Sequence, residues 1–492
     1  MCTLDTIEYD DTLEIEEIKK NIKIASCAIN STCTPDNKPL CKKCEYRQVQ
    51  LVLRNKNQYC RICFLTMLTH KFKATLGKSK LVQPNDSILV AHSGKASSTV
   101  LVHLLSTDTN ESISRKLRFR YKVLYIDDGM VKKRTIEERE FIRNALAKEA
   151  ECLRSTMYMI PLTKCLTNIV YEDIHSVNVP QVSATTEDAV LAEIFDNLEN
   201  DTAKDELSRQ LKRKVIVSAA RKLCCNKVFI ADTSVDLAIK VVGDVSTGRG
   251  SQLPFNVAFS DVRHTDVTLL RPLRDLTGDE VIAYLDCFKL YPVLDSQKFN
   301  SSFPVSIRNV ARSFVQQLDG EVNGTVSTIY RTSEKLATKM VELDNVSDAN
   351  TDTNIDVNHI CIVCDLNFKS HYPSVERVST VQAKLFSKLV STGIITPSDA
   401  MLDSLDVCEE STDEEMKTRN MLKRKACQCD GINICNTTQG QSIIEQHLCY
   451  SCRLIFLDSK QMCTALPNFI LTAIEKKLQI ARLEREIKDF LL

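Results

Sequence analysis

The chain has 492 residues, and its 64 Lys and Arg balance 64 Asp and Glu, so its formal net charge is zero. This length allows two to four domains, because a single hydrophobic core rarely grows beyond about 250 to 300 residues. No apolar run approaches the roughly 20 residues of a membrane span, and the N-terminus resembles neither a signal nor a transit peptide. The sequence therefore predicts a cytoplasmic protein with reduced cysteines and no membrane contact.

Acidic residues are concentrated in two segments. Residues 1–17 contain seven Asp and Glu and no Lys or Arg, and residues 403–415 show the same bias. Both compositions are typical of solvated, disordered chain. We therefore predict a disordered tail over residues 1–25 and an acidic insertion at about 398–420.

Four cysteines near the N-terminus have the spacing C-x2-C-x15-C-x2-C. They are Cys41, Cys44, Cys60 and Cys63. Two thiolate pairs, each on a tight turn, are typical of a tetrahedral structural Zn²⁺ site without an open position for chemistry. A disulfide framework would need an oxidising compartment, which nothing in the sequence indicates. We predict one structural zinc in a module that spans residues 26–80 and includes a helix.

Once the acidic segments are set aside, the remaining chain is basic. Its Lys and Arg cluster in HKFKATLGKSK (70–80), RKLRFRYK (115–122) and RQLKRK (209–214). Such clusters bind phosphate in nucleic-acid-binding proteins. They are equally expected on solvated helix faces and edge strands, so both interpretations stay open here.

Residues 81–300 alternate between short apolar segments and helix-length segments. The expected strands are SILVA (87–91), KVLYID (122–127), TMYMIPL (156–162), KVFIAD (227–232) and VTLLRPL (267–273). The expected helices lie at 135–153, around 187–200, at 207–223 and at 234–244. This regular alternation predicts an α/β domain with a doubly wound parallel sheet.

Ligands of such a sheet bind beyond the carboxyl ends of its strands. This places the loop HSGKASS (92–98), Asp127 with Asp128, and residues 232–234 at one rim. Serine hydroxyls and free backbone amides before a helix suit phosphate, although helix capping alone explains the same serines. The loop is not a Walker loop, because no GK[ST] ends it.

Two more C-x2-C pairs follow a predicted helical region and linker at 301–358. They are Cys361 with Cys364 and Cys449 with Cys452, on either side of the acidic insertion. We predict that they form a second structural zinc site in a C-terminal region over 359–492.

Two other features of this C-terminal region stay open. Cys427 and Cys435 either complete another metal site or lie in a loop. The amphipathic segment 471–492 either caps the core of this chain or contacts a partner.

The loop SGKASST resembles the PP-loop of the ATP pyrophosphatase family, whose motif is SGGxDS. YIDDG (125–129) and FIADTSVD (229–236) stand where that family has its second and third nucleotide-site elements. With the cysteine pairs at both ends and phrases such as STGRGSQLPFNVAFSDVRH and LCYSCR, the chain resembles the cytoplasmic tRNA 2-thiolation protein 2 family. This resemblance covers roughly residues 40–300 and the C-terminal cysteine region, and it implies a PP-loop ATPase-like, Rossmann-like domain flanked by two zinc-binding modules.

The loop departs from the active motif at two positions. Lys95 replaces the second glycine, and Ser97 replaces the aspartate that helps to organise metal and nucleotide. A hydroxyl is a poor substitute for a carboxylate as a ligand of a hard cation, whereas Lys95 could still contact phosphate as a point charge. Asp232 stands where many family members have histidine. We expect a degenerate nucleotide site made by Ser93, Gly94, Lys95, Ser97, Ser98, Asp128 and Asp232.

Active thiolases of the resembling family carry a C-x-x-C pair in the PP-loop domain for sulfur transfer or an iron–sulfur cluster. No such pair lies between Cys63 and Cys361. The interior cysteines are scattered, and we expect them to be structural. They are Cys152, Cys165, Cys224, Cys225 and Cys287. The chain is therefore expected to have no catalytic residues.

The resemblance implies a heterodimer with a catalytic PP-loop subunit that binds ATP and Mg²⁺. The complex would convert wobble uridine to 2-thiouridine in the tRNAs for Lys, Glu and Gln, with sulfur from a ubiquitin-like protein thiocarboxylate. This chain would supply structural zinc and a basic surface for tRNA. The expected tRNA-binding residues are Lys71, Lys73, Lys78, Lys80, Arg118 and Arg120.

Two alternatives stay open from the sequence. The chain could be an ATP-dependent tRNA sulfurtransferase that is active by itself through Ser93, Gly94, Lys95, Ser98 and Asp128. It could also be a zinc-bearing RNA-binding adaptor whose α/β domain is only a scaffold. Fold-level analogy does not separate these functions, because related α/β sheets host many activities.

Overall fold

The computed structural model describes residues 39–53, 57–108, 119–179, 185–294, 303, 305–321, 324–333, 360–366, 447–457, 470, 472–477, 479 and 483. The predicted acidic tail, the acidic insertion and Cys427 and Cys435 lie outside the described residues, as does most of the segment 471–492.

A seven-stranded sheet forms the centre of the molecule, in the order β6-β5-β4-β3-β7-β9-β8. The five inner strands run parallel: β3 (Ser87–His92), β4 (Arg120–Asp127), β5 (Met157–Pro161), β7 (Lys227–Ile230) and β9 (Thr268–Leu270). Short antiparallel strands, β6 (His175–Ser176) and β8 (Ser260–Asp261), form the two edges. The chain proceeds from β3 outward to β5 and then returns to the other side of β3, so the sheet is doubly wound. The predicted fold class is confirmed.

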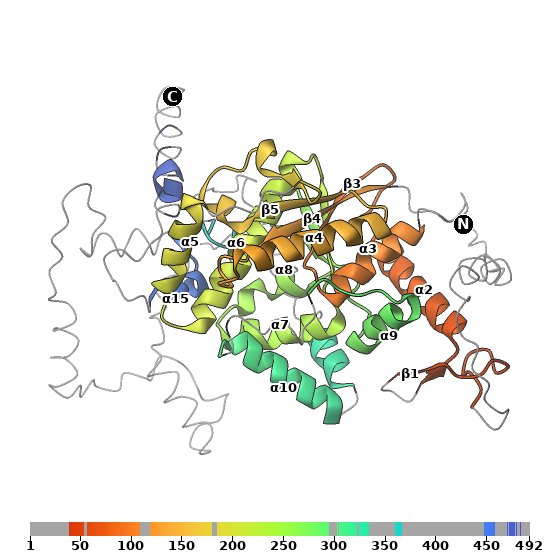
Figure 1. The fold of residues 1–492 in the computed structure, drawn as a ribbon. Helices are drawn as coiled ribbons and strands as arrows, with labels where there is room; N and C mark the ends of the chain where they lie inside the picture. Colours follow the sequence, from red (N-terminus) through yellow and green to blue (C-terminus); the bar gives the residue numbers. More distant parts are fainter. Residues whose placement is uncertain are drawn as a thin grey trace, which may run out of the picture.

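Residues of the central strand alternate between two cores. Ile88 and Val90 pack with α2 (Arg61–Ser79), α3 (Ala96–Asp108), α4 (Ile136–Cys152) and α9 (Gly278–Phe288). Leu89 packs on the opposite face with α5 (Thr186–Asp196) and α6 (Asp201–Lys222) (Figure 1). Because both faces are buried, the inner strands are continuous apolar runs, which is why their positions could be predicted.

Four helices begin with a Thr that is followed three residues later by Glu or Asp. They are α4, α5, α9 and α7 (Ser234–Ser246), with Thr135, Thr185, Thr277 and Thr233 at their N-caps. Each Thr side chain accepts the third helical amide, and the acidic side chain accepts the Thr amide, so two free donors are satisfied. Helix α6 begins at Asp201, before the predicted residue 207, because the Asn200 side chain accepts the Ala203 amide at 2.6 Å.

The remaining elements surround this domain. Helix α10 (Ile307–Glu321) packs on α7, and the short η3 (Gly250–Gln252) and α8 (Leu253–Val257) follow α7. Two further 3₁₀ turns, η1 (Leu162–Leu166) and η2 (Tyr171–Asp173), connect β5 to β6. The hairpin of β1 (Leu51–Val52) and β2 (Gln58–Tyr59) and the helix α15 (Tyr450–Leu457) lie at opposite ends of the molecule (Figure 1). No helix in the described part of the chain is long and apolar enough to cross a membrane.

Candidate functional site

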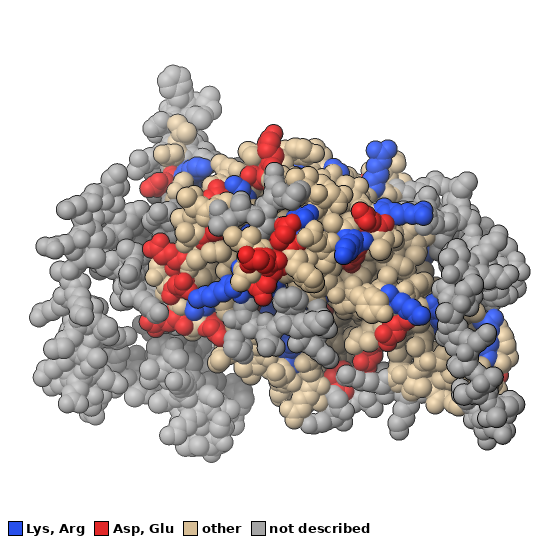
Figure 2. Space-filling view, in the orientation of Figure 1, with Lys and Arg blue, Asp and Glu red and all other residues tan. Residues whose placement is uncertain are grey.

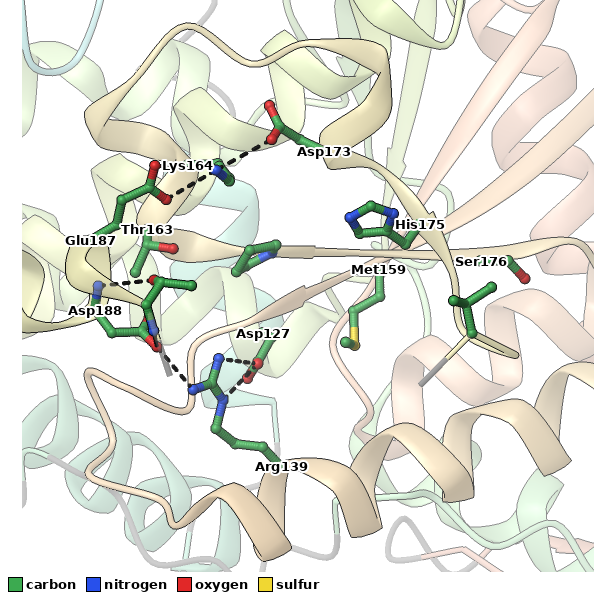
Figure 3. Close-up of a pocket in the computed structure, with 13 residues that line it drawn as sticks. Asp127, Arg139, Met159, Thr163, Lys164, Asp173, His175, Ser176, Glu187 and Asp188 are labelled. Atoms are coloured by element: carbon green, nitrogen blue, oxygen red, sulfur yellow. Dashed lines mark hydrogen bonds and ion pairs between the residues drawn. The ribbon is translucent and has the colours of Figure 1, made fainter. Parts of the chain in front are cut away.

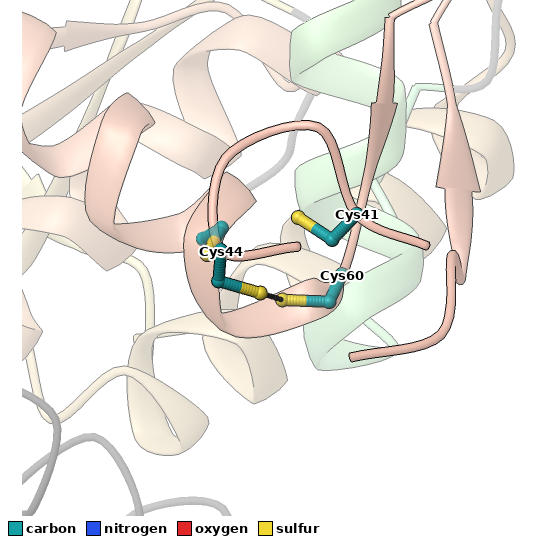
Figure 4. Close-up of side chains that lie close together, drawn as sticks. Cys41, Cys44 and Cys60 are labelled. Atoms are coloured by element: carbon teal, nitrogen blue, oxygen red, sulfur yellow. Dashed lines mark hydrogen bonds between the residues drawn. The ribbon is translucent and has the colours of Figure 1, made fainter. Parts of the chain in front are cut away.

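The N-terminal cysteines converge as their spacing predicts. Cys41 and Cys44 lie on one turn, Cys60 directly precedes α2, and Cys63 lies in its first turn. The four Sγ atoms lie within 4.8 Å of one another, and those of Cys44 and Cys60 are 3.9 Å apart (Figure 4). Burial acts to raise the pKa of Cys41, but hydrogen bonds with backbone of Cys60 and Cys44 lower it to about 6. Burial and the neighbouring thiols of Cys60 and Cys44 raise the pKa of Cys63, so the four thiols of this group do not ionise alike.

The C-terminal cysteines also converge, although a long stretch of chain separates the two pairs. Cys361, Cys364, Cys449 and Cys452 are all buried, and their Sγ atoms lie within 4.8 Å of one another. The Sγ atoms of Cys364 and Cys449 are 3.6 Å apart. These residues belong to the same hydrophobic core as α5 and α6. Within the described residues, these two tetracysteine groups are the only clusters with a geometry that could hold a metal ion.

The loop after β3 is closed by its own hydrogen bonds. The Gly94 amide donates to Nδ1 of His92 at 3.1 Å, and the Lys95 amide lies 3.4 Å from the Ser93 hydroxyl. Ser98 donates from its hydroxyl to the Lys95 carbonyl at 2.7 Å. The two amides that a phosphate would need are therefore already directed at groups of the protein.

Leu294 occupies the space directly beside this loop. Its amide donates to the Gly94 carbonyl at 2.7 Å, and its side chain is buried. Gly94 has φ +76°, and a Cβ atom there would lie 2.9 Å from Cγ of Leu294. Glycine is required because the left-handed backbone and the adjacent leucine both exclude a side chain.

Asp128, the predicted acidic residue at the end of β4, is surrounded by cations of the same chain. Its carboxylate lies 2.7 Å from Nζ of Lys132 and 3.6 Å from Nη1 of Arg134, and it also binds Lys212 of α6. Burial acts to raise the pKa of Asp128, but Lys212 and Lys132 hold it below its usual range. The carboxylate thus serves as an internal counter-charge.

Asp232 has a similar environment at the end of β7. It is paired with Lys240 of α7 at 2.5 Å and with Arg271 at 3.1 Å. Burial opposes ionisation of Asp232, yet these two cations keep its pKa below the ordinary value. Together with Asp128, this places two neutralised carboxylates at the predicted rim.

The rim is nevertheless positively charged around Lys95. Burial among its neighbours lowers the pKa of Lys95, and Arg312 of α10 and Lys212 of α6 lower it further. Cations from three elements that are distant in sequence therefore lie near one another at this rim, together with the carboxylates of Asp236 and Asp128.

A cavity of about 360 Å³ lies beyond the ends of β4 and β5. Arg139 of α4 crosses it and pairs with Asp127 at 2.7 Å and with Asp188 at 3.3 Å (Figure 3). On the other wall, Lys164 pairs with Asp173 at 3.3 Å and with Glu187 at 3.0 Å. Four carboxylates and two cations line this cavity, and each of the two cations is shared by two carboxylates.

The expected tRNA-binding residues do not form one cluster. Lys78 and Lys80 are exposed at the end of α2, whereas Lys71 pairs with the buried Glu280 at 2.6 Å. Arg120 is exposed at the start of β4, at the end of that strand away from the rim, and Arg118 lies outside the described residues. Figure 2 shows Lys and Arg interspersed with Asp and Glu on one face of the molecule.

Three of the five interior cysteines, Cys165, Cys225 and Cys287, do not have the environment of nucleophiles. Burial raises the pKa of Cys165 to about 12, and it also raises the pKa of Cys225 and Cys287. A thiol with a raised pKa is a poor nucleophile at neutral pH. This environment agrees with a structural role for these three, whereas Cys152 and Cys224 are exposed, and their structural role stays a prediction.

The family model and the individual relatives that match this chain carry the same description. The family model for cytoplasmic tRNA 2-thiolation protein 2 matches residues 306–454. The chain is 28% identical over 498 residues to the protein of that name from Danio rerio, covering 92% of this chain and 94% of the relative. It is 26% identical over 511 residues to the protein of the same name from Homo sapiens, covering 93% of this chain and 94% of the relative.

Over most of its length the chain is similar to proteins of the cytoplasmic tRNA 2-thiolation protein 2 family. Among solved structures, it is similar to the U34-tRNA thiolase NcsA from Methanococcus maripaludis with its [4Fe-4S] cluster. The identity is 17% and the TM-score is 0.48, with 68% of this chain and 98% of that chain covered.

Several residues around the candidate sites were not predicted from the sequence. Lys212 and Arg312 reach the rim from distant helices, and Leu294 fills the loop. Arg249 and Gln252 contact the C-terminal cysteines. Arg249 and Gln252 lie in the segment STGRGSQLPFN. Their burial could not be predicted, because the sequence does not show that this segment packs against the C-terminal cysteines.

Proposed function

We propose that this chain is a non-catalytic subunit of a cytoplasmic tRNA 2-thiolation complex. The observation that carries the proposal is the closed loop after β3, in which Leu294 packs against Gly94 and the loop amides donate to groups of the protein. The family relatives supply the reaction, because each is named for 2-thiolation of tRNA.

The proposed division of labour follows from the charges. A magnesium–nucleotide site needs accessible carboxylates as ligands of the hard cation. Here Ser97 replaces the motif carboxylate, and Asp128 and Asp232 are each paired with at least two cations of the chain. We therefore assign ATP and Mg²⁺ to a catalytic PP-loop partner in a heterodimer.

The tetracysteine sites are proposed to hold one structural Zn²⁺ each. With Zn–S bonds of about 2.3 Å, the edges of an S₄ tetrahedron are about 3.8 Å long. The separations of 3.9 Å between Cys44 and Cys60 and 3.6 Å between Cys364 and Cys449 fit this value. Sulfur atoms within 4.8 Å of one another leave room for one ion and not for a cluster of four irons. Zinc bound to four thiolates would cross-link the chain without supplying a catalytic position.

In the proposed complex, wobble uridine of the tRNAs for Lys, Glu and Gln receives sulfur from a ubiquitin-like thiocarboxylate. This chain contributes tRNA-binding surface, for which the exposed Lys78 and Lys80 at the end of α2 are the best placed of the expected residues. Phosphate contacts by such lysines position RNA without reading its sequence.

Reconstitution tests the proposed function. The chain is purified alone and together with the PP-loop protein that accompanies it from its native cytosol. Each sample receives ATP, Mg²⁺, a thiocarboxylated sulfur donor and a tRNA transcript, and 2-thiouridine is detected by mercury-affinity electrophoresis. We expect thiolation from the pair and none from the chain alone. Thiolation by the chain alone would establish a sulfurtransferase, and RNA binding with no effect on thiolation would establish an adaptor.

A further inference from the structure

The C-terminal cysteine site is built into the α/β domain, whereas the N-terminal site is attached to it. Cys361, Cys364, Cys449 and Cys452 share the core that contains Leu207 and Leu211 of α6. The N-terminal cysteines form a small cluster of their own. Any charge that forms at the C-terminal site must therefore be stabilised by buried groups of the domain, because water does not reach it.

Arg249 directs a buried positive charge at this site. The residue is 0% exposed, and its Nη1 and Nη2 atoms lie 3.7 and 3.8 Å from Sγ of Cys452. Its Nη2 also donates to the Ser451 carbonyl at 3.3 Å. On its other side, Nε of Arg249 lies 3.1 Å from Oε1 of Glu206. The guanidinium thus bridges the α6 carboxylate and the second cysteine pair.

Glu206 alone does not neutralise Arg249, because it is shared with other cations. Its carboxylate lies 2.7 Å from Arg209 and 3.8 Å from Arg308. Both arginines also approach Asp244, at 3.4 and 3.3 Å. Three guanidinium groups therefore surround two buried carboxylates, and the one that faces the sulfur atoms is Arg249.

Gln252 adds hydrogen-bond donors on the neighbouring side of the site. The side chain is 0% exposed, and its Nε2 atom lies 3.7 Å from Sγ of Cys364 and 3.8 Å from Sγ of Cys449. Its Oε1 atom accepts from Nη1 of Arg249 at 3.3 Å, which fixes the orientation of the amide. Arg249, at the N-cap of η3, and Gln252, at its end, thus offer N–H groups to three of the four sulfur atoms.

Four thiolates around one divalent cation have a formal charge of about two negative units, which is costly to bury without compensation. Hydrogen bonds to a thiolate favour the ionised form, and groups outside the ligand shell hold ligands in position. We propose that Arg249 and Gln252 hold the C-terminal tetracysteine site in its metal-binding form. The metal then fastens the C-terminal segment to η3 and α6. This inference rests on the metal occupancy proposed above.

Metal release from the full-length chain tests the role of these two residues. A background with Cys41→Ser and Cys60→Ser leaves the C-terminal site as the zinc site that is observed, and transfer of zinc to a chromogenic chelator is followed with time. Arg249→Met and Gln252→Met should each release zinc about 10- to 100-fold faster, the usual effect of losing an outer hydrogen-bond partner. Arg249→Lys should fall between, because it keeps the charge and loses the planar fork.

Arg209→Met is the matched control. The substitution removes a guanidinium that pairs with the same Glu206. In the described structure the Arg209 side chain contacts no sulfur atom, so zinc should leave this variant at the rate of the background protein. Cobalt substitution gives a second readout. Loss of N–H donors raises the energy of the sulfur electrons, so the sulfur-to-cobalt charge-transfer band of Gln252→Met should move to longer wavelength.

The outcomes separate the two proposals. A background chain that contains no metal would refute the C-terminal metal site itself. Metal that is present but leaves Gln252→Met at the background rate, with an unshifted cobalt band, would refute the role of η3, even if Arg249→Met fails to fold. Equal acceleration in Arg209→Met would also refute it, because general loosening of the buried charges would then explain the release.

Discussion

Replacing Asp128 by Asn tests whether this carboxylate is a structural counter-charge or a metal ligand. Its side chain is 5% exposed and approaches three cations, which are Lys132 at 2.7 Å, Arg134 at 3.6 Å, and Lys212. Asn preserves the shape of the side chain and removes its charge, so the cations lose their shared carboxylate. A carboxylate that is kept for a metal ion and has no partners in the metal-free protein behaves differently, because its removal then costs little stability.

The expected loss of stability follows from the exposure of the cations. Removing one partner of a buried ion pair costs about 3 to 5 kcal/mol. The Lys132 and Lys212 side chains are 26% and 33% exposed, so water compensates them in part, whereas Arg134 is only 7% exposed. We therefore expect a loss of about 3 kcal/mol in the free energy of unfolding of the α/β domain, or about 6 to 12 °C in Tm.

The effect should depend on pH in one direction. Burial would raise the pKa of Asp128, but Lys212 and Lys132 hold the folded-state pKa below that of the unfolded chain. The carboxylate therefore stabilises the fold above the unfolded pKa of about 3.9, and this stabilisation is lost as the pH falls toward the folded pKa. The difference in Tm between wild type and Asp128→Asn should be full at pH 7 and shrink below about pH 4.

Calorimetry or intrinsic fluorescence measures this Tm, and Asp196→Asn is the control. Asp196 pairs with Lys133 at 3.0 Å, but the two side chains are 59% and 80% exposed, so its loss should cost less than about 1 kcal/mol. If Asp128→Asn has the same Tm as Asp196→Asn and wild type, the Asp128 carboxylate is not the counter-charge described above.

Three further outcomes are expected. Cys41→Ser with Cys60→Ser should reduce bound zinc from two ions per chain to one, measured by atomic emission, while the α/β domain keeps its Tm. Lys78→Glu with Lys80→Glu should weaken tRNA binding and lower the slope of log K against log salt by up to about 2, measured by fluorescence anisotropy. Gly94→Ala should destabilise the domain by about 2 to 4 kcal/mol, because φ is +76° and the new Cβ meets Leu294.

Each of these outcomes has a control. Cys152→Ser, at an exposed position, should leave both metals bound. Lys148→Glu reverses an exposed charge on α4, and the slope of log K against log salt for tRNA binding should be the same as for wild type. Gly250→Ala meets no atom within 4 Å and should be tolerated far better than Gly94→Ala. Equal effects of a variant and its control would contradict the corresponding prediction.

Local patterns in the sequence were sufficient for the frame of the molecule. Strands β3, β4 and β5 are apolar runs because both of their faces are buried. The spacing of Cys41, Cys44, Cys60 and Cys63 predicted their convergence, since two tight turns close over a short loop. The replacements Lys95 and Ser97 were likewise visible as departures from a motif. All of these signals lie within a few turns of chain.

The tertiary structure decided how each site is completed. Lys212 and Arg312 reach the rim from α6 and α10, and Leu294 closes the loop at Gly94 from the segment after α9. Arg249 meets Cys452 across 203 positions of sequence. Such contacts have no local signature, because a buried arginine and an exposed one are the same letter in the sequence. The tertiary environment decides whether an arginine side chain is a surface charge, a counter-ion or a hydrogen-bond partner of a thiolate.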